Sequence, residues 1–132
     1  MRCRLCILPL LALALGGCDG EPVVIRSQAF PSPDGAYTAT LEEVDNGLGF
    51  GQGALYNEVH LTRQGESTGR HGDPGRSVVF YVESTYKNGG AVKIEWLDRQ
   101  HLRVEFGGEQ RPGRMSASLN GVAIEYRQTK PQ

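Results

Sequence analysis

The chain has 132 residues, 39% of them hydrophobic and 22% charged, a composition that favours one soluble globular domain over a disordered chain. Fourteen basic and fifteen acidic residues give a formal net charge of -1, which argues against binding to nucleic acid through a clustered basic surface. Eighteen glycines and seven prolines predict many turns.

The N-terminal segment has the composition of a secretory signal peptide. Residues 1–4 include Arg2 and Arg4, an apolar stretch runs from Leu5 to Leu15, and small residues follow before Cys18. This order is typical of a leader that is removed during export. The apolar stretch covers roughly ten residues, whereas a membrane-spanning helix needs about 20. The sequence therefore predicts a signal peptide over residues 1–17.

The motif Leu15-Gly16-Gly17-Cys18 resembles the lipobox of bacterial lipoproteins. In that family the cysteine sulfur receives a diacylglycerol, the signal peptidase cuts before the cysteine, and the new amino terminus is acylated. The resemblance implies lipid on Cys18, with Leu15, Gly16 and Gly17 read by the signal peptidase. Two alternatives stay open, namely an ordinary secretory signal with a chance cysteine and an uncleaved anchor.

The same resemblance implies a location. Asp19 would be the second mature residue, and in enteric lipoproteins aspartate at this position tends to hold the protein at the inner membrane. We expect the periplasmic face of the cell membrane, with the inner membrane weakly favoured and the outer membrane left open. Cys3 and Cys6 would leave with the leader, so Cys18 would be the sole mature cysteine and no internal disulfide would form.

The mature chain reads as a short tether over residues 18–22 followed by strands. Apolar and polar residues alternate with period two between clusters of glycine, proline, asparagine and aspartate, and no helical periodicity persists. We expect a single all-β domain over 23–127, either an antiparallel sandwich or a curled meander sheet of about seven or eight short strands, with a frayed tail over 128–132. The expected strands are 23–30, 36–44, 55–63, 77–85, 91–97, 101–106, 114–119 and 121–127, with Phe80, Ile94, Trp96, Leu102, Val104, Phe106 and Ile124 in the core.

The glycine-dense loop over residues 45–53 is the first candidate contact surface. It contains G-x-G-x-G, but no helix pattern follows, so the loop lacks the helix N-terminus that cradles phosphate groups. Its apolar pair, Leu48 and Phe50, either folds over the edge of the core or contacts a partner.

Metal-binding and catalytic patterns are weak. The histidines His60, His71 and His101 fall in different expected elements, and His71 and Asp73 place an imidazole and a carboxylate together in the loop over 64–76. A solvated surface loop explains that pair more simply, so we expect no metal and no cofactor.

Acid/base and nucleophilic chemistry are not indicated either. Glu42, Glu43 and Asp45 cluster where one expected strand ends, which is most simply a solvated strand end. No nucleophile–base pair or metal triad can be drawn, so the sequence predicts a protein that is not an enzyme.

A wider pattern leads to the expected function. The segments S-P-D-G-x-Y over 32–37, V-K-I-E-W-L-D over 92–98 and V-A-I-E-Y over 122–126 resemble small bacterial envelope proteins of unknown function, often lipoproteins. The single S-P-D-G-x-Y copy excludes a β-propeller, which repeats that unit. We expect a lipid-anchored, non-catalytic binding or assembly accessory module with an envelope protein partner. The alternative is a periplasmic small-ligand or metal-binding domain that uses the 64–76 loop.

Overall fold

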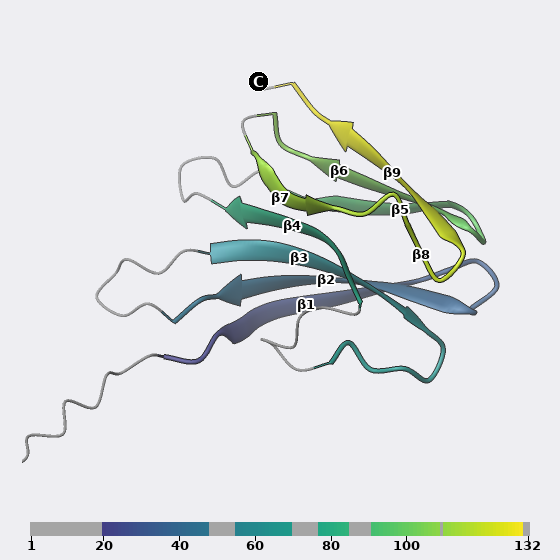
Figure 1. Cartoon of the computed structure of the whole chain (residues 1–132), viewed down its shortest axis with the longest axis horizontal. Helices are drawn as coiled ribbons and strands as arrows, with labels where there is room; N and C mark the ends of the chain where they lie inside the picture. Colours follow the sequence, from purple (N-terminus) through teal and green to yellow (C-terminus); the bar gives the residue numbers. More distant parts are fainter. Residues whose placement is uncertain (1–19, 48–54, 70–76, 85–90, 109, 131–132) are drawn as a thin grey trace, which may run out of the picture.

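The computed structural model describes residues 20–47, 55–69, 77–84, 91–108 and 110–130. Within these ranges the regular structure consists of strands, which form two sheets packed as a sandwich (Figure 1). The first sheet has the strand order β1-β2-β3-β4-β7, and the second has the order β5-β6-β9-β8. The predicted all-β class is confirmed, and of the two expected architectures the structure has the sandwich.

The strand boundaries lie close to the predicted ones. The first sheet contains β1 (Val23–Pro31), β2 (Tyr37–Asp45), β3 (Leu55–Arg63), β4 (Val78–Ser84) and β7 (Pro112–Met115). The second sheet contains β5 (Lys93–Asp98), β6 (His101–Phe106), β8 (Ser118–Leu119) and β9 (Val122–Gln128).

The stretch expected as one strand over 114–119 is divided between the two sheets. The Ser116 amide donates to the Val79 carbonyl of β4, whereas the Ala117 carbonyl accepts from the Ile124 amide of β9. The chain therefore crosses from one sheet to the other between adjacent residues, which ends β7 and begins β8.

One strand pair departs from the expected antiparallel arrangement. β6 and β9 are parallel, with Leu102 opposite Ile124 and Val104 opposite Tyr126. Parallel neighbours cannot be joined by a tight hairpin and need a long crossover connection. Here that connection passes through β7 in the other sheet, so the second sheet is mixed.

The core lies between the facing sides of the two sheets. Phe80 is fully buried at its centre, with its ring centroid 5.3 Å from that of Phe106 and 5.7 Å from that of Tyr126. Of the seven expected core residues, five are buried, and Ile94 and Trp96 are only partly buried because β5 is an edge strand. The buried apolar residues that form the cluster are Ala39, Val59, Leu61, Val79, Phe80, Val82, Val92, Leu102, Val104, Phe106, Val122 and Ile124.

Polar tips of aromatic side chains connect the two sheets. Trp96 Nε1 of β5 donates to the Phe30 carbonyl of β1 at 2.8 Å, and the Tyr37 hydroxyl of β2 donates to the Asn120 carbonyl at 3.0 Å. Each ring packs against the core while its polar atom is hydrogen-bonded, which is the arrangement that buried tryptophan and tyrosine require.

Candidate functional site

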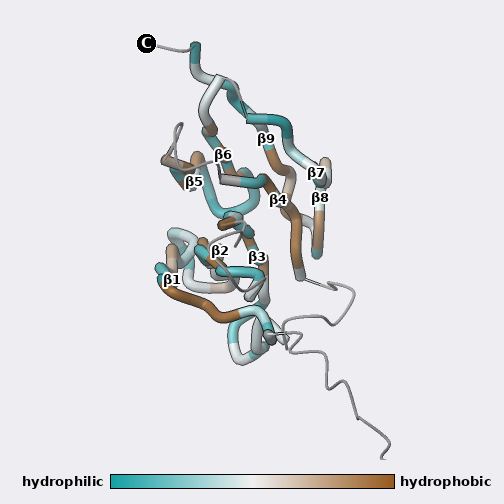
Figure 2. Tube along the Cα trace, turned by 90° about the vertical axis from the view of Figure 1, so that its left-hand side faces the viewer, coloured by the Kyte–Doolittle hydropathy of each residue, from teal (hydrophilic) through white to brown (hydrophobic). Residues whose placement is uncertain are grey.

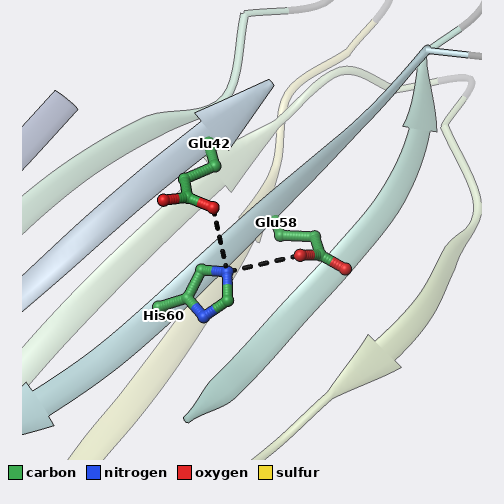
Figure 3. A group of neighbouring side chains, drawn as sticks. All are labelled: Glu42, Glu58 and His60. Carbon is green, nitrogen blue, oxygen red and sulfur yellow. Dashed lines mark ion pairs between the residues drawn. The ribbon is translucent and has the colours of Figure 1, made fainter. Parts of the chain in front are cut away.

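The face of the first sheet that points away from the second sheet carries a buried polar cluster. Strand alternation places Glu58 and His60 on that face of β3, and the register places Glu42 of β2 directly opposite Glu58. The three side chains point toward one another (Figure 3) and are 12%, 15% and 8% exposed for Glu42, Glu58 and His60. Carboxylates are seldom so buried, and we call this group the Glu–Glu–His cluster.

Neighbouring groups on the same face enclose the cluster. The Ser77 hydroxyl, just before β4, lies 3.0 Å from His60 Nδ1 and 2.8 Å from the Thr68 carbonyl. On the side of Glu58, the rings of Tyr56 and Tyr81 pack with their centroids 5.1 Å apart. The segment after β3 and this tyrosine pair therefore keep water away from a strand face that an isolated sheet would expose.

The electrostatic surroundings are negative and poorly hydrated. Burial, followed by the charge of Glu58, raises the pKa of Tyr56 to about 12, and Tyr81 and Glu42 contribute in the same direction. Burial and the nearby carboxylates of Glu83 and Glu58 likewise raise the pKa of Tyr81. Both shifts show surroundings that disfavour the charged phenolate, first through burial and then through the nearby carboxylates.

The hydrogen bonds around Ser77 assign the tautomer of His60. The single hydroxyl proton of Ser77 is donated to the Thr68 carbonyl, so Ser77 Oγ accepts in its contact with the imidazole. The donor in that contact is then Nδ1–H. In the neutral ring, Nε2 consequently carries a lone pair rather than a proton.

The Nε2 atom faces the two carboxylates. It lies 3.3 Å from Glu58 Oε2 and 3.5 Å from Glu42 Oε2, and it is buried without a hydrogen-bond partner. A lone pair directed at two carboxylate oxygens is unfavourable unless a positive charge lies among them. One ligand atom from each residue falls within 4.8 Å of the others, a spacing at which the three residues could share one metal ion.

The same residues do not form a serine-nucleophile arrangement. A general base must accept the proton of the nucleophile, but Ser77 donates its proton to Thr68 and accepts from His60. The serine hydroxyl therefore orients the imidazole and is not activated by it.

A second feature is a cleft between the edges of the two sheets, where β1 and β5 approach each other. Its volume is about 500 Å³. Its walls combine an apolar part with charged groups of both signs. The described residues that line it are Arg26, Gln28, Phe30, Leu41, Glu43, Asn57, Ala91, Val92, Lys93 and Ile94.

The structure corrects the interpretation of the acidic strand end. Glu42 is not solvated but belongs to the Glu–Glu–His cluster, because its side chain meets those of Glu58 and His60 on the neighbouring strand β3. Glu43 points the other way and lines the cleft, while Asp45 accepts a hydrogen bond from the Gly47 amide.

The remaining predicted site residues divide into two groups. His101 is exposed and forms a 2.6 Å contact with Asp98 at the β5–β6 turn, far along the chain from the other histidine contacts. The lipobox residues Leu15, Gly16, Gly17 and Cys18, the apolar pair Leu48 and Phe50, and the loop pair His71 and Asp73 lie outside the described residues.

Sequence reasoning missed Glu58 and the role of His60. Glu58-x-His60 on a strand is itself a ligand spacing, since residues two apart share one face. Alternation by itself places both residues on the polar face of a half-buried strand. The pairing of Glu42 with Glu58 and the contact of Ser77 with His60 arise from tertiary structure and cannot be read from the alternation.

In the part of the chain that the structure describes, no helix is long and apolar enough to cross a membrane. Comparisons with protein-family models, with curated proteins and with solved structures find no significant match.

Proposed function

We propose that this protein is a lipid-anchored bacterial envelope protein whose β-sandwich is a non-catalytic binding module for a partner protein. The anchor is supported by the resemblance of residues 15–18 to a lipobox. From Cys18 to the start of β1 at Val23, an extended chain spans at most about 17 Å. Lipid on Cys18 would therefore hold the sandwich close to the membrane surface on the periplasmic side.

The unpaired edge of β1 is the observation that carries the binding role. Among the described strands, β1 is the end of the first sheet, and it is nine residues long with Arg26 as its single charged side chain. Val23, Val24 and Ile25 are 57%, 37% and 53% exposed, and this apolar start of β1 is visible in brown in Figure 2. Long apolar edges are usually protected by charges because they accept additional strands. β1 is thus suited to pair with an extended segment of another protein.

The cleft beside β1 would supply specificity. A strand added along β1 places alternate side chains toward the space between the sheets. There they meet apolar groups, including Phe30 and Ile94, and charges of both signs from Arg26, Glu43 and Lys93. We infer an extended partner segment that combines apolar residues with charged ones.

Site-specific photo-crosslinking in cells tests this assignment. A photoreactive residue replaces Gln28, which is exposed on β1 and lines the cleft, in the full-length protein. We expect one reproducible protein adduct, which Ile25→Lys should remove because a lysine protects the edge. Met115→Lys is the matched control, since Met115 is 49% exposed on β7 at the opposite edge of the same sheet. It should leave the adduct unchanged.

The anchor has its own test. Membrane fractionation and intact mass are recorded for the wild type and for Cys18→Ser, with the adduct measured in both. We expect a membrane-bound, acylated wild type and a soluble, unmodified variant that forms less adduct. An unacylated wild type would refute the anchor, and an acylated protein without an adduct at Gln28 would refute the protein-binding role in favour of a small ligand in the cleft.

A further inference from the structure

The Glu–Glu–His cluster lies on the opposite face of the first sheet from the cleft, so the proposed partner-binding role does not account for it. Its distinguishing observation is His60 Nε2. This atom belongs to a side chain that is 8% exposed, it points into the cluster, and it has no hydrogen-bond partner. Buried polar atoms are nearly always paired, so an unpaired one calls for an occupant.

We propose that Glu42, Glu58 and His60 form a binding site for a divalent transition-metal ion of the zinc class. The ligand set of one imidazole nitrogen and two carboxylate oxygens is common for zinc. Three protein ligands leave one position of a tetrahedral ion for water or another donor.

The distances within the cluster fit such an ion. Ligand atoms about 2.0–2.1 Å from a tetrahedral zinc ion lie about 3.4 Å from each other. The observed separations from His60 Nε2 are 3.3 Å to Glu58 Oε2 and 3.5 Å to Glu42 Oε2. Each of these two nitrogen–oxygen distances therefore matches the separation expected around a bound ion.

The surroundings of His60 also prepare it for metal binding. A metal-binding histidine usually donates its second ring N–H to a nearby acceptor, which fixes the ring and leaves the other nitrogen free to coordinate. Ser77 Oγ is that acceptor here, and Ser77 is in turn held by the Thr68 carbonyl. The arrangement presents the lone pair of Nε2 to the two carboxylates.

The ligand types favour zinc over calcium and magnesium. Calcium takes six to eight oxygen ligands, and magnesium takes a near-octahedral shell of oxygens that includes several waters. One imidazole and two carboxylates instead suit divalent transition-metal ions, which accept both nitrogen and oxygen ligands. Among these ions, zinc imposes no coordination geometry of its own and can adopt the geometry that the protein offers.

The test uses the full-length protein purified in detergent and stripped of metal with a chelator. Titration calorimetry with zinc chloride measures stoichiometry and affinity, and visible absorption with cobalt chloride reports the coordination. We expect one zinc ion per chain and the intense absorption of four-coordinate cobalt. Glu42→Gln and His60→Gln should weaken zinc binding by at least roughly 100-fold, more than the 10–100-fold typical for loss of an outer-shell partner.

A matched control separates this site from adventitious binding by histidine. His101 forms an exposed contact with Asp98 at 2.6 Å, and both side chains are more than half exposed. His101→Gln should therefore leave zinc affinity unchanged. Thermal melting of each metal-free variant checks folding, and if His60→Gln does not fold, Glu58→Gln takes its place because it keeps the size of the side chain.

Two results would overturn the proposal. Absence of zinc heat and of cobalt absorption would show that the cluster does not bind a transition-metal ion of this class. Zinc binding of equal affinity in the wild type and in folded variants of the cluster would place the ion elsewhere. Since the measurement uses purified protein, neither result depends on the lipid anchor or on capture of a partner.

Discussion

Replacing Ser77 by alanine tests whether one hydroxyl group prepares His60 for metal binding. In the wild type, Ser77 Oγ accepts from Nδ1–H at 3.0 Å and donates to the Thr68 carbonyl at 2.8 Å. The substitution leaves a buried ring N–H without this acceptor, which costs about 1–3 kcal/mol of folding stability. The ring can relieve that cost by moving the proton to Nε2, which faces the carboxylates of Glu42 and Glu58.

That change of tautomer should lower metal affinity. A proton on Nε2 must be displaced before a metal can bind, and the imidazole also loses the contact that orients it. We therefore expect Ser77→Ala to weaken zinc binding by about 10–100-fold, which corresponds to about 1.4–2.7 kcal/mol. The assay is zinc calorimetry on the full-length protein, together with urea unfolding of the metal-free form.

Two further variants make the result specific. Ser77→Thr keeps a hydroxyl group and should restore most of the zinc affinity. Thr62→Val removes a hydroxyl from the same face of β3, where it donates to the Thr38 carbonyl at 3.4 Å, and should leave zinc binding nearly unchanged. If Ser77→Ala lowers stability but binds zinc as tightly as the wild type, the assignment of Ser77 as a positioning residue is refuted.

Three further predictions concern the sandwich itself. Trp96→Phe removes the donor to the Phe30 carbonyl and should lower the free energy of unfolding, measured by urea titration, by about 1 kcal/mol. An unchanged free energy of unfolding would mean that this hydrogen bond between the sheets adds no net stability. Phe80→Ala should lower it by about 3–5 kcal/mol, because the ring is fully buried at the centre of the core, and a smaller loss would show that the site collapses. Burial raises the pKa of Tyr126 from 10.0 to about 12, so the neutral side chain stabilises the fold below pH 10 and this contribution is lost as the pH rises toward 12. Tyr126→Phe cannot ionise at this position. Circular dichroism should therefore show a smaller alkaline loss of stability for this variant than for the wild type.

The strands could be predicted from the sequence because their signals are local. The turn after β1 is an example: the Asp34 carboxylate accepts from Ser32 Oγ and from the Ala36 amide, and Gly35 has a φ of 70°. Those residue types produce that turn in most contexts. The alternation over 55–63 and over 101–106 likewise gave strand boundaries that the structure confirms.

Strand pairing could not be predicted in the same way. It depends on register between segments far apart in the chain, which a single sequence does not encode locally. The two halves of the stretch 114–119 therefore looked like one strand, although β7 pairs with β4 and β8 pairs with β9. The parallel pairing of β6 and β9 has the same origin.

The Glu–Glu–His cluster was hidden for a related reason. Alternation assigns Glu58 and His60 to one face of β3 but does not say whether that face meets water. The position of Ser77 beside His60 and the pairing of Glu42 with Glu58 decide this, and both arise from long-range contacts. Burial of polar residues was therefore the least predictable property of the chain, although it defines the site.

The consecutive residues Val59, His60, Leu61 and Thr62 are all buried, so β3 is covered on both faces. Apolar side chains could fill the buried outer face of β3 without any loss of folding stability. A buried nitrogen without a partner, in contrast, costs about 1–3 kcal/mol out of a typical total stability of 5–15 kcal/mol. Natural proteins tend to depart from local consistency at functional positions. A bound cation would give the buried Nε2 of His60 the partner that it lacks, and this is the observation that favours the proposed metal site over a purely structural role for the cluster.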